Sequence, residues 1–522
     1  MHISAHRKRL LLKIGNAPLL KGLALASLLA LVVFECYLMQ KHVWIGDFWT
    51  HVPPIIEFSK APPYDNPWIN GSQPDLYMTP YHWILGKVLA ISGADVLNLM
   101  VVVGVANLVF LFVALYYFGR IVLKLKGWLA PLLLFLSLLL YWGYNPWSYS
   151  GFFALGNLNF ILPYPSTFCM ILILSGLTLQ EWGVKKKKLF IAFVAVVQSG
   201  ILWFMFLTHP LSFIFYNVGL AAWFLAEIYR KRYLDRNLIY TWVLPLFASG
   251  LFILLYPHFP VLEFFRSGGG NFHEANLDMY SDNLFLRLLP LFTGAILLFL
   301  LPGKQYIFLK SFFLLLCCIY LLGWITGQYS FGRSIALIYF CVQAAVVAFL
   351  KWQWIRTVNY RRSVSFLGLT GIVMILAVVG LQLYWSVQAA WYLALKEETR
   401  IDQIKQLSKY LNPDDDVVIT NDTELAFLIP TLLTKGLIPL QPSIWIRDGA
   451  KRKSLVDSFF ISPHPNQHLK PLRELGATHA LIQTKDSNSP LLLSYPIVFS
   501  NQMYALVRID SSLVFSPHTV QH

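Results

Sequence analysis

An acidic residue and a histidine stand one helical turn apart in the stretch VWIGDFWTHVPPIIEF, residues 43–58. Asp47 is followed by the aromatic residues Phe48 and Trp49, and His51 comes four positions later. Apolar rings beside a carboxylate reduce its hydration and raise its pKa, which suits it to accept a proton from an attacking hydroxyl. The alternative is structural, because an acid at this position could cap a short helix that begins at Phe48.

More polar residues gather in the same loop, at about residues 40–93, which is far too long for a simple connection. Asp75 stands next to a proline, so it is either a second carboxylate of a site or an ordinary turn residue. His51 could be a partner of Asp47, a metal ligand or a histidine at the membrane interface. His82 belongs to the same set of candidate binding residues. The stretches FWTHVPPIIEF and YHWILGKVLAI predict short helices that lie in the interface.

Four candidates lie outside this loop. Arg333 stands alone among apolar residues in TGQYSFGRSIAL. A phosphate would match its guanidinium bidentately, and the alternative is an arginine that reaches lipid headgroups. His209 lies in the turn FLTHPLSF, where it either lines a cavity or caps a helix. His273 and Glu274 belong to the loop FFRSGGGNFHEANLDMYSD, whose three glycines predict a segment that orders when substrate binds.

The elements that must position these residues are membrane helices. The chain has 522 residues, of which 57% are hydrophobic and 13% are charged, and its mean hydropathy is +0.57. Several apolar runs reach the roughly 20 residues that cross a bilayer core. The first run is too long for a signal peptide, so we expect it to remain as a helix. The sequence predicts an α-helical polytopic membrane protein with about eleven transmembrane helices, near residues 19–39, 96–119, 128–144, 167–182, 189–207, 211–229, 238–256, 284–301, 306–326, 334–350 and 365–387.

The charge of the connecting segments predicts the orientation. Alternate segments, beginning with the N-terminus, contain 21 Lys and Arg residues, and the opposite set contains 5. Cytoplasmic loops collect Lys and Arg, so we expect the N-terminus inside, and Asp47 and the C-terminal segment outside. The net charge of +15 is therefore a topology signal, and no nucleic-acid partner is needed to explain it. The five cysteines fall inside apolar runs and show no disulfide or zinc spacing.

The C-terminal segment has a different composition. EETRIDQIKQLSKYL predicts an amphipathic helix, DDDVVITN a strand, and LRELGATHALIQT a helix that runs into a strand. YPIVFSNQMYALVRI predicts a hairpin with its turn at residues 500–502. We therefore expect two domains: a transmembrane domain over residues 1–394, which includes the loop 40–93, and a small soluble α/β domain over residues 395–522.

The stretches IGDFWTH and QPDLYMTPYHWILG, with the helix count and the trailing α/β domain, resemble the GT-C superfamily of membrane glycosyltransferases. The resemblance spans nearly the whole chain, and the sequence is similar to the type of the dolichyl-phosphate-mannose-protein mannosyltransferases and the aminoarabinose transferases. It implies an inverting enzyme that moves a sugar from a polyprenyl phosphate to a glycan, lipid or protein acceptor outside the membrane. Many relatives have two adjacent acids at the position of Asp47, whereas here Phe48 follows it.

In that family the carboxylate at the Asp47 position is the catalytic base or positions the acceptor. The resemblance also admits a divalent cation, Mg or Mn, although the sequence does not identify its ligands. The resulting hypothesis has the lipid-linked donor between the helices and the first outer loop, with Arg333 on its phosphate, in the plasma (inner) membrane of a bacterium. Two rival functions are a transporter or flippase of lipid-linked saccharides, for which we see no repeated halves, and a non-catalytic membrane scaffold.

Overall fold

The structure is a computed structural model that describes most of the chain. The described residues are 18–42, 44, 48–69, 73, 75–125, 127, 129–183, 188–233, 236–266, 274–281, 283–360, 366–395, 399–437, 446, 448–462, 464–486 and 490–509. They divide into two compact units. The first, here the helical unit, takes residues within Met1–Lys41, Met100–Tyr256 and Gly269–Leu395. The second, the mixed unit, takes residues within His42–Leu99, Pro257–Gly268 and Lys396–His522.

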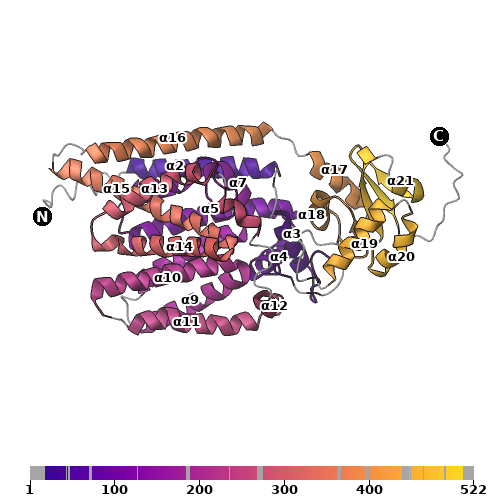
Figure 1. The fold of residues 1–522 in the computed structure, drawn as a ribbon, viewed down its shortest axis with the longest axis horizontal. Coiled ribbons are helices and arrows are strands. Elements are labelled where there is room, and N and C mark those ends of the chain that lie inside the picture. Colours follow the sequence, from indigo (N-terminus) through magenta and orange to yellow (C-terminus); the bar gives the residue numbers. More distant parts are fainter. Residues whose placement is uncertain are drawn as a thin grey trace. The chain divides into compact units, whose positions relative to one another are not determined.

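The helical unit is a bundle of long apolar helices, several of which run alongside one another in Figure 1. Each of the eleven segments predicted to span the membrane contains a helix. These helices are α2 (Pro18–Gln40), α5 (Val96–Ile121), α6 (Leu129–Leu140), α8 (Pro165–Gly183), α9 (Lys188–Thr208), α10 (Pro210–Lys231), α11 (Arg236–Leu254), α13 (Leu284–Leu300), α14 (Ile307–Thr326), α15 (Ser334–Tyr360) and α16 (Phe366–Leu395).

Not all of these helices are long enough to cross a bilayer by themselves. Among the described residues, seven are long and apolar enough, and an eighth arises if α8 is joined to the preceding short helices. Those helices, η1 (Leu155–Asn157) and α7 (Leu158–Ile161), are bent by 107° from α8. The helix α6 has only 12 residues, which span about 18 Å at the usual helical rise. The fold is therefore a polytopic helical bundle in which part of the expected set of spans is short or broken.

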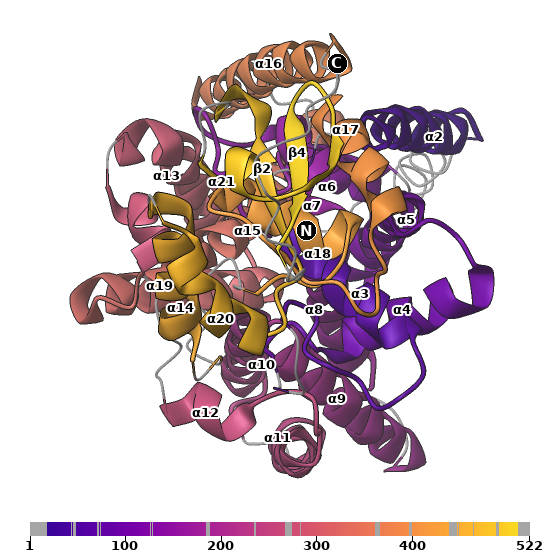
Figure 2. The same cartoon turned by 90° about the vertical axis from the view of Figure 1, so that its right-hand side faces the viewer.

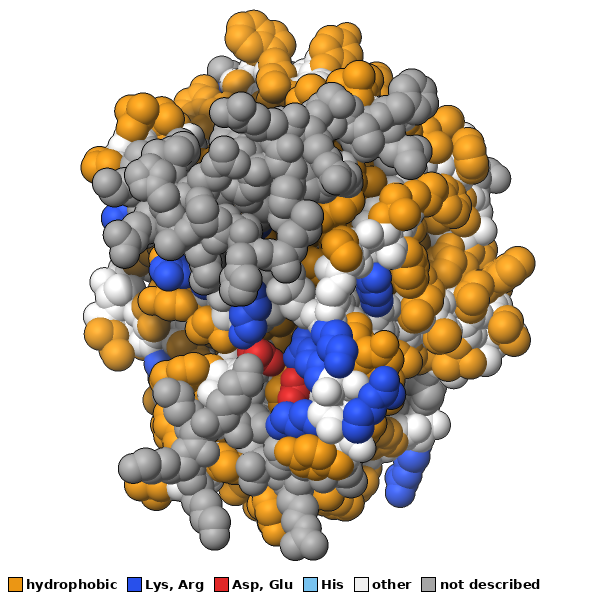
Figure 3. Space-filling view, turned by 90° about the vertical axis from the view of Figure 1, so that its left-hand side faces the viewer, with side chains coloured by type: hydrophobic (Ala, Val, Ile, Leu, Met, Phe, Trp, Pro, Cys, Tyr) orange, Lys and Arg blue, Asp and Glu red, His pale blue; other side chains and the backbone are white. Residues whose placement is uncertain are grey.

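One end of the helical unit is rich in ion pairs. The buried Glu181 accepts a hydrogen bond from Lys124 Nζ at 2.8 Å, and Arg230 pairs with Glu227 at 2.7 Å. Lys351 Nζ donates to the Lys124 carbonyl at 3.3 Å. These contacts bring together segments that the sequence assigns to the basic set, and Lys and Arg side chains gather around acids on the face shown in Figure 3. We call this the basic end.

The mixed unit combines the first long loop with the C-terminal segment. Its four-stranded sheet has the order β1-β2-β4-β3, with β1 parallel to β2 and the other pairs antiparallel. Figure 2 shows β2 and β4 side by side. The elements of this unit are α3 (Phe48–Ser59), α4 (Pro80–Ser92), α12 (Val261–Arg266), α17 (Thr399–Leu407), β1 (Val418–Ile419), α18 (Thr423–Leu432), α19 (Gly449–Ile461), α20 (Asn466–Glu474), β2 (His479–Gln483), α21 (Pro490–Ser494), β3 (Ile497–Ser500) and β4 (Tyr504–Arg508).

The local patterns in the sequence explain these elements. The apolar residues of β2 and β4 place Ala480 and Val507 in the core, where they pack with Phe459 of α19 and Leu472 of α20. The predicted hairpin is present, with its turn at residues 501–503, one residue later than predicted, and Asn501 Oδ1 accepts the Tyr504 backbone N–H at 2.9 Å. The predicted short helices of the first loop are α3 and α4. They contact each other so closely that a Cβ on Gly86 would lie 2.8 Å from the Ile55 carbonyl oxygen.

Several contacts join the first loop to the C-terminal segment. The Gly436 backbone N–H donates to the Trp68 carbonyl at 2.9 Å, and Lys435 Nζ lies 3.0 Å from Asp65 Oδ2. Ile69 forms a single parallel bridge with Gly436. The first loop is thus part of the structure that surrounds the edge of β1. The predicted division of the chain at residues 394 and 395 stays a prediction.

Candidate functional site

Arg333 is the centre of a polar cluster in the helical unit, at the end of α14 opposite the basic end. It closes the short helix η5 (Tyr329–Arg333), directly before α15. Its Nε donates to Asn276 Oδ1 and its Nη1 donates to Ser150 Oγ, both at 2.7 Å. The guanidinium also lies over the Tyr149 ring, 5.0 Å from its centroid. These contacts fix a half-buried cation among neutral donors and acceptors.

The loop that supplies Asn276 is anchored by aromatic stacking. The short helix η3 (Glu274–Tyr280) places the Tyr280 ring 4.6 Å from that of Tyr320 on α14. The Tyr320 hydroxyl donates to the Met279 carbonyl at 2.9 Å. Gly332 permits this approach, because a Cβ there would lie 2.8 Å from both Met279 Cβ and a Tyr280 ring carbon. The described part of the predicted mobile loop is therefore tied to η5 and α14.

His209 lies close to the same cluster. It is the N-cap of α10, and its Nδ1 accepts the Ser212 backbone N–H at 3.2 Å. The ring proton therefore belongs on Nε2. Burial, and after it the positive charge of Arg333, lowers the pKa of His209 to about 3. The predicted helix cap is present, and it holds a neutral imidazole within electrostatic range of the arginine.

A second arginine in this part of the chain was missed by the sequence analysis. Arg287 lies in the first turn of α13, and its guanidinium carbon is 4.6 Å from the centroid of the Trp147 ring. Its Nε and the indole N–H of Trp147 are both buried without a hydrogen-bond partner among the described residues. No ion pair joins Arg287 or Arg333 to a carboxylate within the described ranges. The available signal was the lone charge in NLFLRLLPLF.

In the mixed unit, two predicted histidines meet. His51 of α3 and His82 of α4 are stacked, and His51 Nδ1 lies 3.1 Å from His82 Nε2. Thr79 caps α4, and its hydroxyl lies 2.8 Å from His82 Nδ1. The His82 ring also donates to the Tyr77 carbonyl. The loop thus forms a chain of polar contacts that runs from Tyr77 and Thr79 through His82 to His51.

The His82 ring is held neutral among these contacts. The Tyr77 carbonyl also accepts the Thr79 backbone N–H, at 2.9 Å. A carbonyl only accepts, so the His82 ring nitrogen that faces it carries the proton. Burial lowers the pKa of His82 to about 3, which keeps it neutral.

Asp75 lies in the same loop and is buried. Its Oδ1 accepts the Tyr77 backbone N–H at 2.9 Å, and the side chains of Trp68 and Asn66 also hydrogen-bond to it. Burial raises the pKa of Asp75 to about 6, against these hydrogen bonds, which lower it. The contact with Tyr77 is the local turn that an aspartate beside proline predicts. Tyr77 therefore contacts Asp75 through its backbone N–H and His82 through its backbone carbonyl.

The remaining predicted residues cannot be placed. Asp47 and His273 lie outside the described residues. Glu274 begins η3, but its side chain is not among those described. Within the described ranges, no three His, Cys, Asp or Glu side chains converge in a way that could hold a metal ion. The described residues therefore do not fit a Mg or Mn site.

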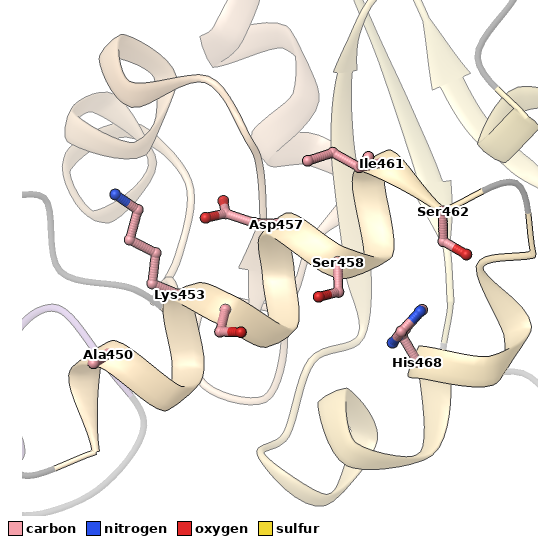
Figure 4. A pocket seen from close by; sticks show the side chains of 8 residues that line it. Ala450, Lys453, Asp457, Ser458, Ile461, Ser462 and His468 are labelled. Atoms are coloured by element: carbon pink, nitrogen blue, oxygen red, sulfur yellow. The ribbon is translucent and has the colours of Figure 1, made fainter.

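The C-terminal part of the mixed unit has an open cavity of about 620 Å³ along α19. Lys453, Asp457 and Ser458 of α19 line it, together with His468 of α20, and Figure 4 shows their side chains along one groove. The groove offers a cation, a carboxylate, an imidazole and hydroxyl groups.

The bundle of membrane helices with its smaller mixed unit defines a structural class. The fold is similar to that of the GT-C membrane glycosyltransferases.

The particular proteins that it resembles are two solved transferases. The oligosaccharyltransferase of Archaeoglobus fulgidus in its apo form aligns with a TM-score of 0.57 at 13% identity, over 88% of this chain and 70% of that one. ArnT from Cupriavidus metallidurans bound to undecaprenyl phosphate aligns with a TM-score of 0.53 at 12% identity, over 96% and 100%. The archaeal enzyme in complex with Zn and sulfate gives 0.52 at 12% identity, over 84% and 64%. No protein-family model matches the chain, and no curated protein matches it.

Proposed function

We propose that this protein is a membrane glycosyltransferase that moves a sugar from a polyprenyl-phosphate donor to an acceptor. The observation that carries the proposal is the likeness to ArnT, a structure bound to undecaprenyl phosphate, over 96% of this chain. The acceptor would be a glycan, a lipid or a protein. The proposed location is a bacterial plasma membrane, with the basic end in the cytoplasm and the Arg333 cluster outside.

Arg333 is the proposed contact for the donor phosphate. Two of its nitrogens are already fixed by Asn276 and Ser150, so the guanidinium is oriented before a ligand arrives. Its Nη2 has no hydrogen-bond partner within the described ranges and can donate to a phosphate oxygen. A preorganised donor of this kind stabilises the charge that develops on a leaving phosphate. Neutral His209, with its proton on Nε2, can donate to the sugar or to the same phosphate.

Asp47 is the proposed catalytic base. As the acceptor oxygen or nitrogen bonds to the anomeric carbon, the bond from that carbon to the phosphate oxygen breaks. The carboxylate takes the proton of the acceptor, and the polyprenyl phosphate leaves with the electron pair. Attack on the side opposite the phosphate inverts the anomeric centre. His51 lies in the first turn of α3, four positions after Asp47, and is proposed to contact the substrate.

The other predicted residues receive supporting roles in this proposal. His82 and Asp75 hold the loop that carries His51. His273 and Glu274 belong to the loop next to Asn276 and are proposed to contact the donor. The groove along α19 is the proposed recognition surface for part of the acceptor. No step is assigned to a metal ion, because the described residues do not form a site for one.

The test is a transfer assay with the full chain in phospholipid nanodiscs and a panel of radiolabelled undecaprenyl-phosphate and dolichyl-phosphate sugars. We expect Asp47→Asn to lower kcat by at least 100-fold and leave donor binding nearly unchanged, because only the base is lost. The matched control is Asp414→Asn, whose carboxylate is 79% exposed on the mixed unit. Equal transfer by wild type and Asp47→Asn would remove Asp47 from the mechanism.

A flippase is distinguished by a second readout. The same donors are placed in one leaflet of proteoliposomes, and their appearance in the other leaflet is followed. Movement across the bilayer without transfer would favour the transporter, and neither activity would favour the scaffold.

A further inference from the structure

The helical unit contains a second cavity that shares no lining residue with the Arg333 cluster. It has a volume of about 490 Å³ and lies between the loop that follows α6 and the C-terminal half of α16. The two segments are in contact, since a Cβ on Gly156 of η1 would lie 3.4 Å from Ser386 Cα on α16, an ordinary van der Waals distance. The cavity is therefore built by two segments of one compact unit that are more than 200 residues apart.

One face of α16 supplies the wall of this cavity. Gln382, Ser386 and Ala389 recur at helical spacing and line it together. Gln382 is 4% exposed and Ser386 is 3% exposed. The Ser386 hydroxyl has no hydrogen-bond partner among the described residues. A buried polar group without a partner is destabilising, and a hydroxylated ligand would supply that partner.

The opposite wall adds an amide and aromatic rings. Asn157 Nδ2 donates to two backbone carbonyls, those of Pro146 and Trp147, so the Asn157 Oδ1 can accept a hydrogen bond. The rings of Tyr144 and Trp385 meet edge to face at 5.6 Å, and both are partly exposed at the rim. Aromatic rings at the rim of a cavity can pack against the face of a sugar ring. Amides and a hydroxyl inside the cavity can hydrogen-bond to the hydroxyls of the sugar.

The lining excludes other ligands by its chemistry. It contains no Lys, Arg, Asp or Glu, so it offers no counter-ion to a phosphate or a carboxylate. A lipid chain would leave the buried Ser386 hydroxyl without a hydrogen-bond partner. A neutral polyhydroxylated ligand can hydrogen-bond to the polar side chains of both walls.

We propose that this cavity binds an uncharged sugar ring. It is a binding site in addition to the proposed phosphate contact at Arg333, and it does not depend on whether the chain transfers sugars. The ring could belong to a free saccharide or to the head of a glycolipid, since the chemistry of recognition is the same.

The experiment measures binding, not transfer. The full chain is reconstituted in phospholipid nanodiscs free of alkyl-glycoside detergent, and saturation-transfer NMR is recorded with neutral trisaccharides of glucose, mannose, galactose and N-acetylglucosamine. We expect at least one to bind, and we expect Trp385→Ala and Gln382→Leu each to raise its Kd by at least tenfold. Glucose 1-phosphate should not compete.

The matched control is Trp324→Ala on α14, which removes an indole that is 63% exposed and does not line the cavity. Its Kd should equal that of the wild type. Gln382→Leu nearly preserves volume and therefore tests the site even if Trp385→Ala does not fold. Absence of saturable binding by every trisaccharide, or binding that survives both substitutions, would overturn the proposal.

Asp47→Asn should leave this Kd unchanged, which separates the cavity from the proposed reaction. A neutral glycolipid that displaces the trisaccharide would identify a lipid-linked source, and its failure to do so a free saccharide.

Discussion

At the scale of single residues, the sequence identified polar side chains that stand alone among apolar residues. It did not identify the residues that contact them. Arg333 was predictable because a lone arginine among apolar residues needs a counterpart. Its partners, Asn276 and Ser150, are 57 and 183 positions away, and neither has an unusual local context. His51 and His82 were each predicted separately, and only the packing of α3 against α4 brings their rings together. Long-range pairing of this kind leaves no local pattern.

The His82 ring gives a prediction about pH. Its folded pKa of about 3 lies below the ordinary value of 6.5, so the stability that depends on the neutral ring is complete above pH 6.5. It is lost as the pH falls from 6.5 toward 3, by up to about 1.4 kcal/mol per unit. We expect the difference in thermal stability between wild type and His82→Gln to shrink between pH 7 and pH 5. A stability difference between wild type and His82→Gln that does not change with pH would contradict this prediction. So would the same pH-dependent change between wild type and His468→Gln.

Arg333 gives a prediction about binding. Arg333→Ala should raise the KM for the lipid-phosphate donor by about 10- to 100-fold, because a charge-assisted hydrogen bond and its charge are removed. Arg333→Lys should recover part of this loss, since it keeps the charge but not the planar fork. Initial rates at varied donor concentration measure both. Equal KM values for all three proteins would place the phosphate elsewhere.

At the scale of elements, hydrophobic patterns indicated where the long helices lie, and each predicted segment contains a helix. The patterns did not indicate which helices are short or broken. The bend of 107° before α8 and the shortness of α6 depend on neighbouring helices that cover the exposed backbone, which composition does not record. In the C-terminal segment, α17, α20 and the hairpin of β3 and β4 were predictable from their local patterns, whereas α18, α19 and α21 were not predicted. The helix η3 was not, because its position depends on aromatic stacking against α14.

The contact between η3 and η5 can be tested through one glycine. Gly332→Ala places a Cβ 2.8 Å from Met279 Cβ, so η3 must shift, at a cost of about 1–3 kcal/mol. We expect a lower melting temperature and weaker donor binding, because Asn276 moves with η3. Gly200→Ala is the control, since nothing lies within 4 Å of the added atom, and it should be neutral or slightly stabilising. Similar effects of both substitutions would contradict the proposed role of the contact.

At the scale of the whole molecule, charge organises the chain. The segments of the basic set are separated by long apolar helices. Several of these segments nevertheless contact one another at the basic end. The sequence could predict that they share a side of the membrane, because the positive-inside tendency acts on each loop separately. The sequence did not reveal that the first long loop packs with the C-terminal segment, because the bridge between Ile69 and Gly436 is a single backbone contact.

The orientation is testable by labelling. In a chain whose five cysteines are replaced by serine, Ser281→Cys should react with a membrane-impermeant maleimide on intact cells. Arg232→Cys, at the end of α10, should react only after the cells are opened. Both positions are exposed to solvent in the structure, so accessibility in the folded chain does not decide the result. The reverse pattern would place the basic end outside.

The pairing of Asp65 with Lys435 also has a consequence in time. The two residues are 370 positions apart, and a ribosome that adds about 5–20 residues per second needs roughly 20–75 seconds to pass from one to the other. For that interval Trp68 and Ile69 have emerged without the segment that later covers them. A newly made chain must therefore keep this part of its first loop from aggregating until the last quarter of the protein arrives.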